Sequence, residues 1–227
     1  MTQTPDPRQI IEVDRRGASQ GSNVSRRKYI AVAGNIGAGK SSMVDFLCQR
    51  YDIQPFFEPN DENPYLEDFY GDMKAWSFAS QIYFLTAKFR LHLELDATPH
   101  NVIQDRTIWE DAEIFAENLY RKKLMTARDY QTYRQLYEAI HDQIQHPDLM
   151  IYLRCPIRTV RKRIAIRGRE MEQNIPIAYL RQLHRLYEDW IGNYSISPVV
   201  IIPTNKLDYL TDLVDCHDIM RTIEKYL

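Results

Sequence analysis

The chain of 227 residues carries 29 lysines and arginines against 31 acidic residues, a formal net charge of -2, and its length suits one sizeable domain. A charge so close to neutrality argues against nucleic acid or an anionic membrane surface as a partner and favours a small-molecule ligand. Three widely spaced cysteines without a CxxC pattern argue against a structural zinc site and indicate a reducing compartment.

The first 28 residues are polar and contain little apolar surface, so we expect a disordered tail over residues 1–28 and one domain over residues 29–227. The tail lacks the apolar core of a signal peptide and contains Asp6, Glu12 and Asp14, which is unlike a mitochondrial presequence. No apolar run approaches the roughly 20 residues needed to cross a bilayer. These features predict a cytoplasmic protein.

Beyond the tail, short apolar runs typical of buried parallel strands alternate with longer segments of helical period. The predicted strands cover residues 29–34, 53–58, 101–105, 149–154 and 198–203. Helices are predicted to begin near Lys40, Ala75, Ile108, Ala127, Ile157, Ile177 and Asp208. This alternation predicts an α/β fold in which helices flank a five-stranded parallel sheet.

The first predicted strand leads into GNIGAGKSS, residues 34–42, which fits the phosphate-binding pattern GxxxxGKS. Its glycines let backbone amides turn toward an anion, and the following helix offers unpaired N–H groups and the positive end of its dipole. Lys40 is expected to reach the β and γ phosphates of a nucleotide, and the Ser41 hydroxyl to ligate Mg²⁺. The residues of this loop predicted to bind ATP are Gly34, Asn35, Ile36, Gly37, Ala38, Gly39, Lys40, Ser41 and Ser42.

The loop alone leaves open a switch, a motor or a kinase. TNKLD, residues 204–208, matches the NKxD pattern with which GTPases read guanine, and DFYG, residues 68–71, matches DxxG. DFYG does not follow a predicted strand, however, so it is poorly placed to bring an aspartate to Mg²⁺. A GTP-binding switch is therefore a weak alternative of a different class, and TNKLD is also explained as an asparagine turn that caps the last helix.

Two further predicted strands end in a carboxylate, and open parallel sheets bind ligands at that end of their strands. Glu58 ends the second strand, and Asp105, followed by Arg106, ends the third. One carboxylate to accept a proton and one to organise Mg²⁺ are what phosphoryl transfer to a hydroxyl requires. Each acid alone is explained as a cap of the next helix, but both together beside the GKS sequence favour a kinase.

A cluster of arginines occurs in RKRIAIRGREMEQ, residues 161–173, next to Gly168, which is able to end a helix. Such a run is most often a solvated helix face. Beside a phosphate-binding loop we interpret it as a flexible lid whose guanidinium groups close over a triphosphate. The lid residues predicted to bind ATP are Arg163, Arg167 and Arg169.

Five segments, in this order, resemble the deoxynucleoside kinase family, and more closely its bacterial deoxyadenosine and deoxyguanosine kinases. They are GNIGAGKSS, FFEPNDENPYLEDFY, FASQIYFL, QDRTIWEDAEIF and RGREMEQNIPIAYL. The resemblance implies a P-loop kinase fold, ATP as phosphate donor, Mg²⁺ as cofactor, and a deoxyribonucleoside that is phosphorylated on its 5′ hydroxyl for nucleotide salvage. It also implies a homodimer joined by helices such as those predicted at Ala75 and Ile108.

The resemblance further implies roles for individual residues. Glu58 is similar to the family's general base, which takes the proton of the 5′ hydroxyl, Arg106 to the arginine that holds this hydroxyl, and Asp105 to a residue near Mg²⁺. The implied nucleoside contacts are Tyr70 and Glu172 with the sugar 3′ hydroxyl, Gln81 with the base by paired hydrogen bonds, and Phe115 with the base by stacking. Without the resemblance, Tyr70 and Phe115 are better explained as core aromatics, and Gln81 as a helix glutamine with satisfied hydrogen bonds.

At the edge of the base, Lys88 stands where the animal purine-accepting members have an arginine, and Asp111 stands at the place of their aspartate. Both are implied substrate-binding residues. Lysine lacks the planar fork of arginine, so the sequence does not decide which nucleobase the substrate carries. Deoxyadenosine is the favoured substrate, and deoxyguanosine or deoxycytidine are the alternatives. The alternative among enzymes is a thymidylate-type nucleoside monophosphate kinase, which would need a further cationic site near Glu58 that the sequence does not reveal.

Overall fold

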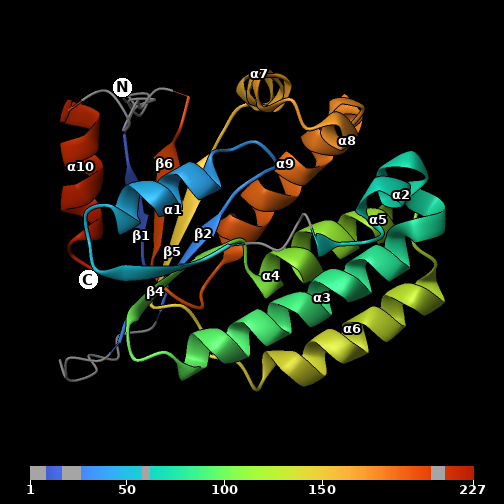
Figure 1. Cartoon of the computed structure of the whole chain (residues 1–227), viewed down its shortest axis with the longest axis horizontal. Coiled ribbons are helices and arrows are strands. Elements are labelled where there is room, and N and C mark those ends of the chain that lie inside the picture. The colour runs from blue at the N-terminus through green and yellow to red at the C-terminus, as the bar shows by residue number, and fades with distance from the viewer. Residues whose placement is uncertain (1–8, 17–26, 58–61, 206–212) are drawn as a thin grey trace, which may run out of the picture.

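The structure is a computed structural model that describes residues 9–16, 27–57, 62–205 and 213–227 (Figure 1). The end of the second predicted strand, the start of the last predicted helix and residues 206–208 of TNKLD lie outside these ranges. In the part of the chain that the structure describes, no helix is both long and apolar enough to cross a bilayer.

A six-stranded sheet with the order β1-β6-β5-β2-β4-β3 forms the centre of the molecule. The strands are β1 (Ile11–Val13), β2 (Tyr29–Ala33), β3 (Ile53–Phe56), β4 (Asn101–Asp105), β5 (Leu149–Arg154) and β6 (Val199–Pro203). The last five pair in parallel, which confirms the predicted five-stranded parallel sheet. Every residue of β2 and β6 is buried because the sheet is covered on both faces.

The short strand β1 corrects the predicted sheet and tail, because it lies within residues 1–28 and pairs antiparallel with β6. Ile10 and Val13 pack against the core. Without β1, the edge of β6 would expose a row of unpaired backbone N–H and C=O groups. The three residues of β1 provide hydrogen-bond partners for these groups. The expectation of a disordered tail is therefore wrong for residues 11–13, and the sheet gains one antiparallel edge strand.

The helical elements follow the predicted starts closely. They are α1 (Lys40–Cys48), α2 (Leu66–Gly71), α3 (Met73–Ala97), α4 (Ile108–Glu110), the π-helical segment η2 (Asp111–Ala116), α5 (Glu117–Arg121), α6 (Ala127–His141), α7 (Ile157–Arg167), α8 (Glu170–Gln173), α9 (Ile177–Asn193) and α10 (Leu213–Ile223). Helix α3 begins slightly before the predicted Ala75 because the Asp72 side chain accepts from the amides of Lys74 and Ala75 and caps it. The short helices α2 and α8 were not predicted.

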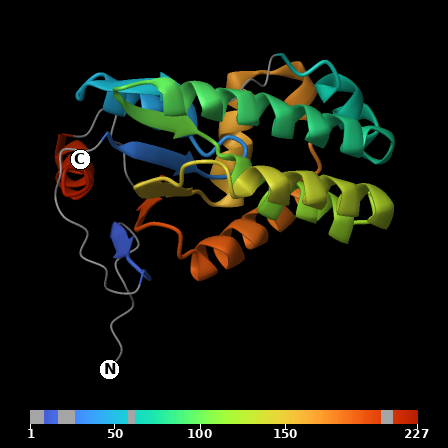
Figure 2. The same cartoon turned by 90° about the horizontal axis from the view of Figure 1, so that it is seen from below.

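The helices are unevenly distributed about the sheet. Both views place α10 on one side of the strands and the long helices α3, α6 and α9 on the other (Figures 1 and 2). Helix α1 packs on β2, β3 and β4, and η2 contacts both α3 and α9. This arrangement brings α3, η2 and α9 together around the loops that leave β2 and β4.

Arg15, just after β1, joins the N-terminal segment to α9. Its Nη1 donates to the backbone oxygens of Ile191 at 2.9 Å and Tyr194 at 3.3 Å, at the C-terminal end of that helix. Because Arg15→Ala removes both bonds, we expect the free energy of unfolding to fall by about 1 kcal/mol and Tm by roughly 2–4 °C. Thermal denaturation followed by circular dichroism measures the change.

The neighbouring Arg16 supplies the matched control. It pairs with Asp14 at 2.8 Å, and both side chains are close to half exposed. An exposed ion pair contributes little to stability, so Arg16→Ala should leave Tm nearly unchanged. An equal Tm for the two variants would show that the end of α9 does not depend on Arg15.

Candidate active site

A cavity of ≈ 300 Å³ lies beside the loop that follows β2 and the end of β4. Residues predicted from widely separated segments line it together: Ile36, Gly37, Lys40, Ser41, Tyr70, Gln81, Asp105, Arg106, Asp111, Phe115, Arg167, Arg169 and Glu172. An apolar wall with a few convergent polar groups is typical of a site for a small molecule. The predicted base Glu58 lies outside the described residues, and Phe57, directly before it, lines the cavity.

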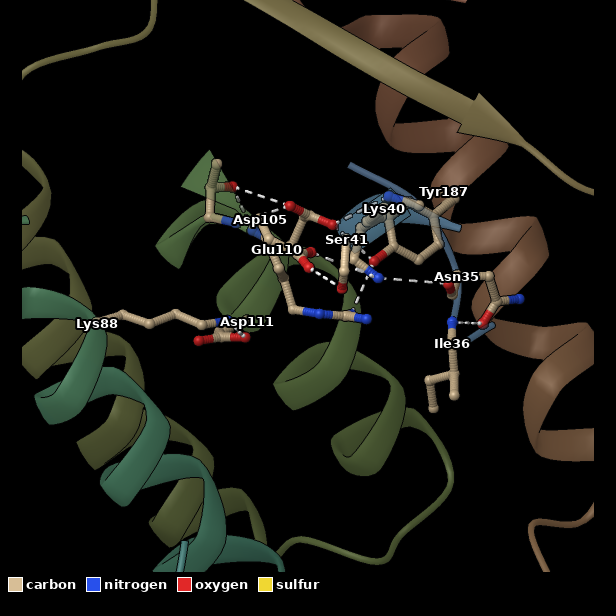
Figure 3. Close-up of polar contacts among 12 residues, drawn as sticks. Asn35, Ile36, Lys40, Ser41, Lys88, Asp105, Glu110, Asp111 and Tyr187 are labelled. Atoms are coloured by element: carbon tan, nitrogen blue, oxygen red, sulfur yellow. Dashed lines mark hydrogen bonds and ion pairs between the residues drawn. The ribbon is translucent and has the colours of Figure 1, made fainter. Parts of the chain in front are cut away.

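The loop between β2 and α1 has the backbone geometry of a phosphate cradle. Gly37 and Gly39 have φ angles of 73° and 102°, in the left-handed region that favours glycine. Asn35 fixes the loop, since its Nδ2 donates to the Leu180 oxygen of α9 at 3.1 Å and its Oδ1 accepts from the Ile36 amide at 2.8 Å (Figure 3). The loop and the positive end of the α1 dipole therefore suit an anionic ligand.

The two predicted metal ligands, Ser41 and Asp105, are in direct contact. The Ser41 hydroxyl donates to Asp105 Oδ2 at 2.6 Å, and Lys40 Nζ lies 3.9 Å from Asp105 Oδ1 (Figure 3). Asp105 Oδ1 is buried and has no hydrogen-bond partner among the described residues. Because a hydroxyl and a carboxylate are the hard oxygen ligands that Mg²⁺ prefers, this pair fits the predicted metal. Ser42, in the same turn of α1, is exposed.

Arg106 follows β4 in a left-handed backbone conformation with φ 62°, which is uncommon for a residue other than glycine. Its amide donates to the Val32 oxygen at 3.0 Å. Its guanidinium donates from Nη1 to the Tyr187 hydroxyl at 3.1 Å, and its Cζ lies 4.4 Å from the centroid of the Phe115 ring. The backbone and these two contacts together direct a buried cation toward the cavity.

The three predicted lid arginines divide into two groups. Arg163 donates from Nη1 to the Ala38 oxygen at 2.6 Å and from Nη2 to the Thr204 oxygen at 2.8 Å. It thus joins the phosphate-binding loop to the end of β6 and does not line the cavity. Arg167 hydrogen-bonds to Glu172, and Arg169 Nη1 lies 3.6 Å from Glu172 Oε1. These two line the cavity, so the prediction of arginines facing the ligand fits them and not Arg163.

The far end of the cavity contains the residues implied to contact a base. The Gln81 Oε1 atom is buried and has no hydrogen-bond partner in the described part of the chain. Lys88 Nζ lies 2.6 Å from Asp111 Oδ1 and is fully buried, and it does not line the cavity. Figure 3 shows this pair at a distance from Ser41 and Asp105. Lys88 therefore pairs with Asp111, which does line the cavity, and the substrate contact implied for Lys88 stays a prediction.

Several lining residues were missed from the sequence: Phe57, Leu66, Phe69, Phe84 and Tyr179. Burial raises the pKa of Tyr179, so its hydroxyl stays protonated at neutral pH. Nothing in the sequence separates Tyr179 from the other apolar residues of α9. The residues behind Arg106, Glu110 and Tyr187, were also missed, although TIWE at residues 107–110 has the capping-box pattern.

The chain is similar to known proteins over most of its length. The family model described as deoxynucleoside kinase matches residues 30–227. A deoxyadenosine/deoxycytidine kinase of Bacillus subtilis is 38% identical over 192 residues, which are 84% of this chain and 88% of that protein. A deoxyadenosine kinase of Lactobacillus acidophilus is 32% identical over 88% of this chain and 96% of its own length.

Solved structures give the same result. Deoxyadenosine kinase from M. mycoides with bound dATP matches with a TM-score of 0.77 at 32% identity, over 87% of this chain and all of the other (100%). The same kinase with the products dCMP and a flexible dCDP matches with a TM-score of 0.78 at 32% identity, over 87% and 99% of the two chains. The implied P-loop kinase fold is therefore confirmed.

Gly37 is the point of closest approach between the phosphate-binding loop and α7. A Cβ there would lie 3.0 Å from Ile164 Cγ1 and 3.2 Å from the Val160 oxygen, at a φ of 73°. A left-handed alanine costs about 1–2 kcal/mol, so we expect Gly37→Ala to weaken ATP binding by about tenfold or more. Isothermal titration calorimetry with ATP measures the affinity.

Gly192→Ala is the control for this substitution. Gly192 lies in α9, and a Cβ there would meet nothing within 4 Å. Alanine is preferred to glycine inside a helix, so this variant should bind ATP as the parent does and be no less stable. ATP affinity unchanged in Gly37→Ala would mean that the loop has room for a side chain.

Proposed function

The chain belongs to the deoxynucleoside kinase family and is an ATP-dependent phosphotransferase, and from this premise we propose which acceptor it uses. The acceptor is a deoxyribonucleoside whose base carries an exocyclic amine beside a ring nitrogen, with deoxyadenosine preferred and deoxycytidine second. Its 5′ hydroxyl receives the γ-phosphate in a reaction that serves nucleotide salvage. The observation that carries this proposal is the buried Gln81 amide oxygen, which has no hydrogen-bond partner among the described residues.

The carboxamide of Gln81 and the carboxylate of Asp111 line the same cavity. A carboxamide accepts with its oxygen and donates with its nitrogen, which matches an exocyclic amine beside an unprotonated ring nitrogen. A carboxylate accepts the second hydrogen of that amine and repels a carbonyl oxygen in its place. Adenine and cytosine meet both conditions. The relatives support this choice, since one is named for deoxyadenosine and deoxycytidine, and the M. mycoides structures contain dATP, dCTP and dCMP.

On the donor side, we propose that the phosphate-binding loop holds the ATP phosphates with its amides, while Lys40 lies against the β and γ phosphates. Ser41 and Asp105 would hold Mg²⁺, which when bound would neutralise the negative charge that develops in phosphoryl transfer. Arg167 and Arg169 stabilise the transferring phosphoryl group from the lid. The contact of Ser41 with Asp105, at 2.6 Å, supports this assignment.

On the acceptor side, we propose that Arg106 holds the 5′ hydroxyl and that Glu58 takes its proton. The 5′ oxygen then attacks the γ-phosphorus in line, and the bond from this phosphorus to the β–γ bridging oxygen breaks. Tyr70 and Glu172 bond the 3′ hydroxyl, and Phe115 stacks on the base. The position of these side chains around one cavity, with Arg106 directed into it, supports these roles for the described members.

The two alternatives left by the sequence are not favoured. A thymidylate-type monophosphate kinase and a GTP-binding switch are both displaced by the family match over residues 30–227. Thr204 and Asn205 of TNKLD follow β6, and Thr204 bonds to Arg163, which supports a structural turn at this point.

We also propose that the enzyme is a cytoplasmic homodimer. The exposed apolar side chains Trp76 and Leu93 on α3 and Leu136 on α6 support an interface over these two helices. Helix α4, which begins at Ile108, is buried within the chain, so the interface expected there is less well supported than the one at α3. Cys48, Cys155 and Cys216 are all free thiols, which is compatible with a reducing cytoplasm.

The base preference is tested by measuring kcat/KM for the four deoxyribonucleosides, with adenosine as the ribose control. We expect deoxyadenosine and then deoxycytidine to rank above deoxyguanosine and thymidine. Asp111→Asn offers a donor in place of one carboxylate oxygen, so the ratio of kcat/KM for deoxyadenosine over deoxyguanosine should fall by about tenfold or more, the scale of a lost specific hydrogen bond. The ratio is independent of how much variant is folded. An unchanged ratio would remove Asp111 from base recognition.

The proposed role of Glu58 as general base is tested by Glu58→Gln. This substitution keeps the size of the side chain and removes its basicity. Turnover should collapse by about 10² or more, the scale of general-base loss, while nucleoside affinity stays within a few-fold. Glu62→Gln is the matched control, because Glu62 is an exposed glutamate nearby, and it should retain full turnover. Turnover retained in Glu58→Gln would assign the proton to another group.

A further inference from the structure

A buried carboxylate, that of Glu110, lies behind the site without lining the cavity. Its Oε2 accepts from the amide of Thr107 at 2.8 Å and from the Thr107 hydroxyl at 3.2 Å. Its Oε1 accepts from the Tyr187 hydroxyl at 2.8 Å and from the amide of Gly34 at 3.3 Å. Four donors around two oxygens satisfy an ionised carboxylate in a buried position. Glu110 thus connects the first glycine of the phosphate-binding loop with the turn directly after Arg106.

The chemistry of the partners determines the direction of each bond at Tyr187. A guanidinium only donates and an ionised carboxylate only accepts, so the Tyr187 hydroxyl accepts from Arg106 Nη1 at 3.1 Å and donates to Glu110 Oε1 at 2.8 Å. This hydroxyl is therefore polarised by Glu110 and presents a strengthened acceptor to Arg106. The order Arg106, Tyr187, Glu110 is a charge pair with a tyrosine hydroxyl between its members.

The packing of α9 holds this hydroxyl in place. The Tyr187 ring is fully buried and lies against Tyr152, with ring centroids 5.8 Å apart and planes at 16°. Leu180, seven residues earlier on the same face of α9, accepts from Asn35 of the phosphate-binding loop at 3.1 Å. One face of α9 therefore contacts both the donor loop and, through Tyr187, the arginine of the acceptor side. Figure 3 shows Glu110 and Tyr187 next to Lys40 and Ser41.

We propose that Glu110 and Tyr187 are positioning residues that aim the Arg106 guanidinium at the acceptor hydroxyl and fix it relative to the phosphate-binding loop. This inference rests on the proposed role of Arg106 in holding the 5′ hydroxyl. Neither Glu110 nor Tyr187 lines the cavity, so each would act through Arg106 or the phosphate-binding loop. The capping box formed by Thr107 and Glu110 fixes the backbone directly after Arg106, whose own backbone is left-handed. Tyr187 contacts the Arg106 side chain.

Tyr187→Phe removes one oxygen atom and keeps the ring that packs on Tyr152. We expect kcat for phosphorylation of deoxyadenosine to fall by about tenfold or more, because in-line transfer is sensitive to small displacements of the acceptor. KM for ATP should stay within about threefold, since the bond from Gly34 to Glu110 remains. This division between kcat and KM for ATP separates positioning of the acceptor from a general loss of structure.

Tyr194→Phe is the matched control. Tyr194 is also a buried tyrosine at the end of α9, and its hydroxyl contacts Ser197 Oγ at 3.1 Å, away from the cavity. Loss of this hydroxyl should leave kcat within about twofold of the parent, because its described contact is with Ser197, while the ring that packs on Trp190 is kept in the variant. A decrease in kcat as large as that of Tyr187→Phe would overturn the inference.

A double-mutant cycle tests whether Tyr187 acts through Arg106. In an Arg106→Ala background, Tyr187→Phe should lower the residual kcat by less than about twofold, whereas independent effects would multiply. Glu110→Gln gives a second test. All four partners of the Glu110 oxygens are donors, so the amide nitrogen of glutamine would face donors at one of the two oxygen positions. The Glu110→Gln variant should have a lower kcat and also a higher KM for ATP, because the side chain at position 110 contacts both Tyr187 and Gly34.

The outcomes separate the inference from the proposed function. If the parent phosphorylates none of the four deoxyribonucleosides, the proposed function fails. If the parent is active and Tyr187→Phe keeps its kcat, or if its effect multiplies with that of Arg106→Ala, the inference fails and the function stands. Should Tyr187→Phe prove unstable, Glu110→Gln decides: unaltered kcat and unaltered KM for ATP would overturn the positioning role.

Discussion

The site depends on the parallel pairing of β2 with β4. In this register Val32 lies opposite Asp105, so the phosphate-binding loop and the Asp105–Arg106 segment leave the sheet at the same level. The Arg106 amide extends the pairing by one more bond to the Val32 oxygen, at 3.0 Å. As a result Ser41 and Asp105, distant in the sequence, lie 2.6 Å apart. A shift of one residue would turn Asp105 to the opposite face of the sheet and separate the donor side from the acceptor side.

Around this junction the protein buries charges that it has to satisfy. Glu110, Arg106 and the pair formed by Lys88 and Asp111 are all buried, and each has charge-assisted contacts. Buried ion pairs are weak contributors to net stability, because the loss of hydration offsets most of the attraction. Removing one partner is nevertheless strongly unfavourable, since it leaves the other charge without compensation. Such groups therefore confine neighbouring side chains to few arrangements, which suits a reaction that depends on position.

Much of the fold could be predicted because the responsible signals are local. The apolar runs of the five parallel strands and the starts of α1, α4, α6, α7 and α9 were read from periodicity and capping. The GNIGAGKS pattern and the strand-end position of Asp105 predicted that Ser41 and Asp105 would lie near each other at one edge of a parallel sheet. The edge strand β1 was missed because three residues with weak alternation resemble a loop, and their pairing with β6 depends on an edge formed far along the chain.

The details of the site were less predictable because they depend on tertiary contacts. The arginines of residues 161–173 look equivalent in the sequence, yet the position of Arg163 on α7 turns it to Ala38 and Thr204. Lys88 was matched to a residue that faces the ligand, but its chain ends on Asp111. Tyr187 has no sequence signal, since its role arises from the meeting of α9 with the segment after β4. Glu110 had a signal, the capping box, which indicates a helix start but not the contact with Gly34.

The contacts of Arg163 have a mechanical consequence for the lid. They attach the middle of α7 to the phosphate-binding loop and to the end of β6. Helix α7 ends at Gly168, which has a φ of 71°, and a Cβ on this residue would meet only the Ile166 oxygen, at 3.9 Å. Arg167 is one helical turn beyond Arg163, about 6 Å along the axis. The helix is therefore held at its middle, and Gly168, with its left-handed backbone, separates it from the segment that carries Arg169. A change in the position of Arg169 relative to the phosphate-binding loop therefore requires rotation of only a few residues about Gly168, without a hinge between domains.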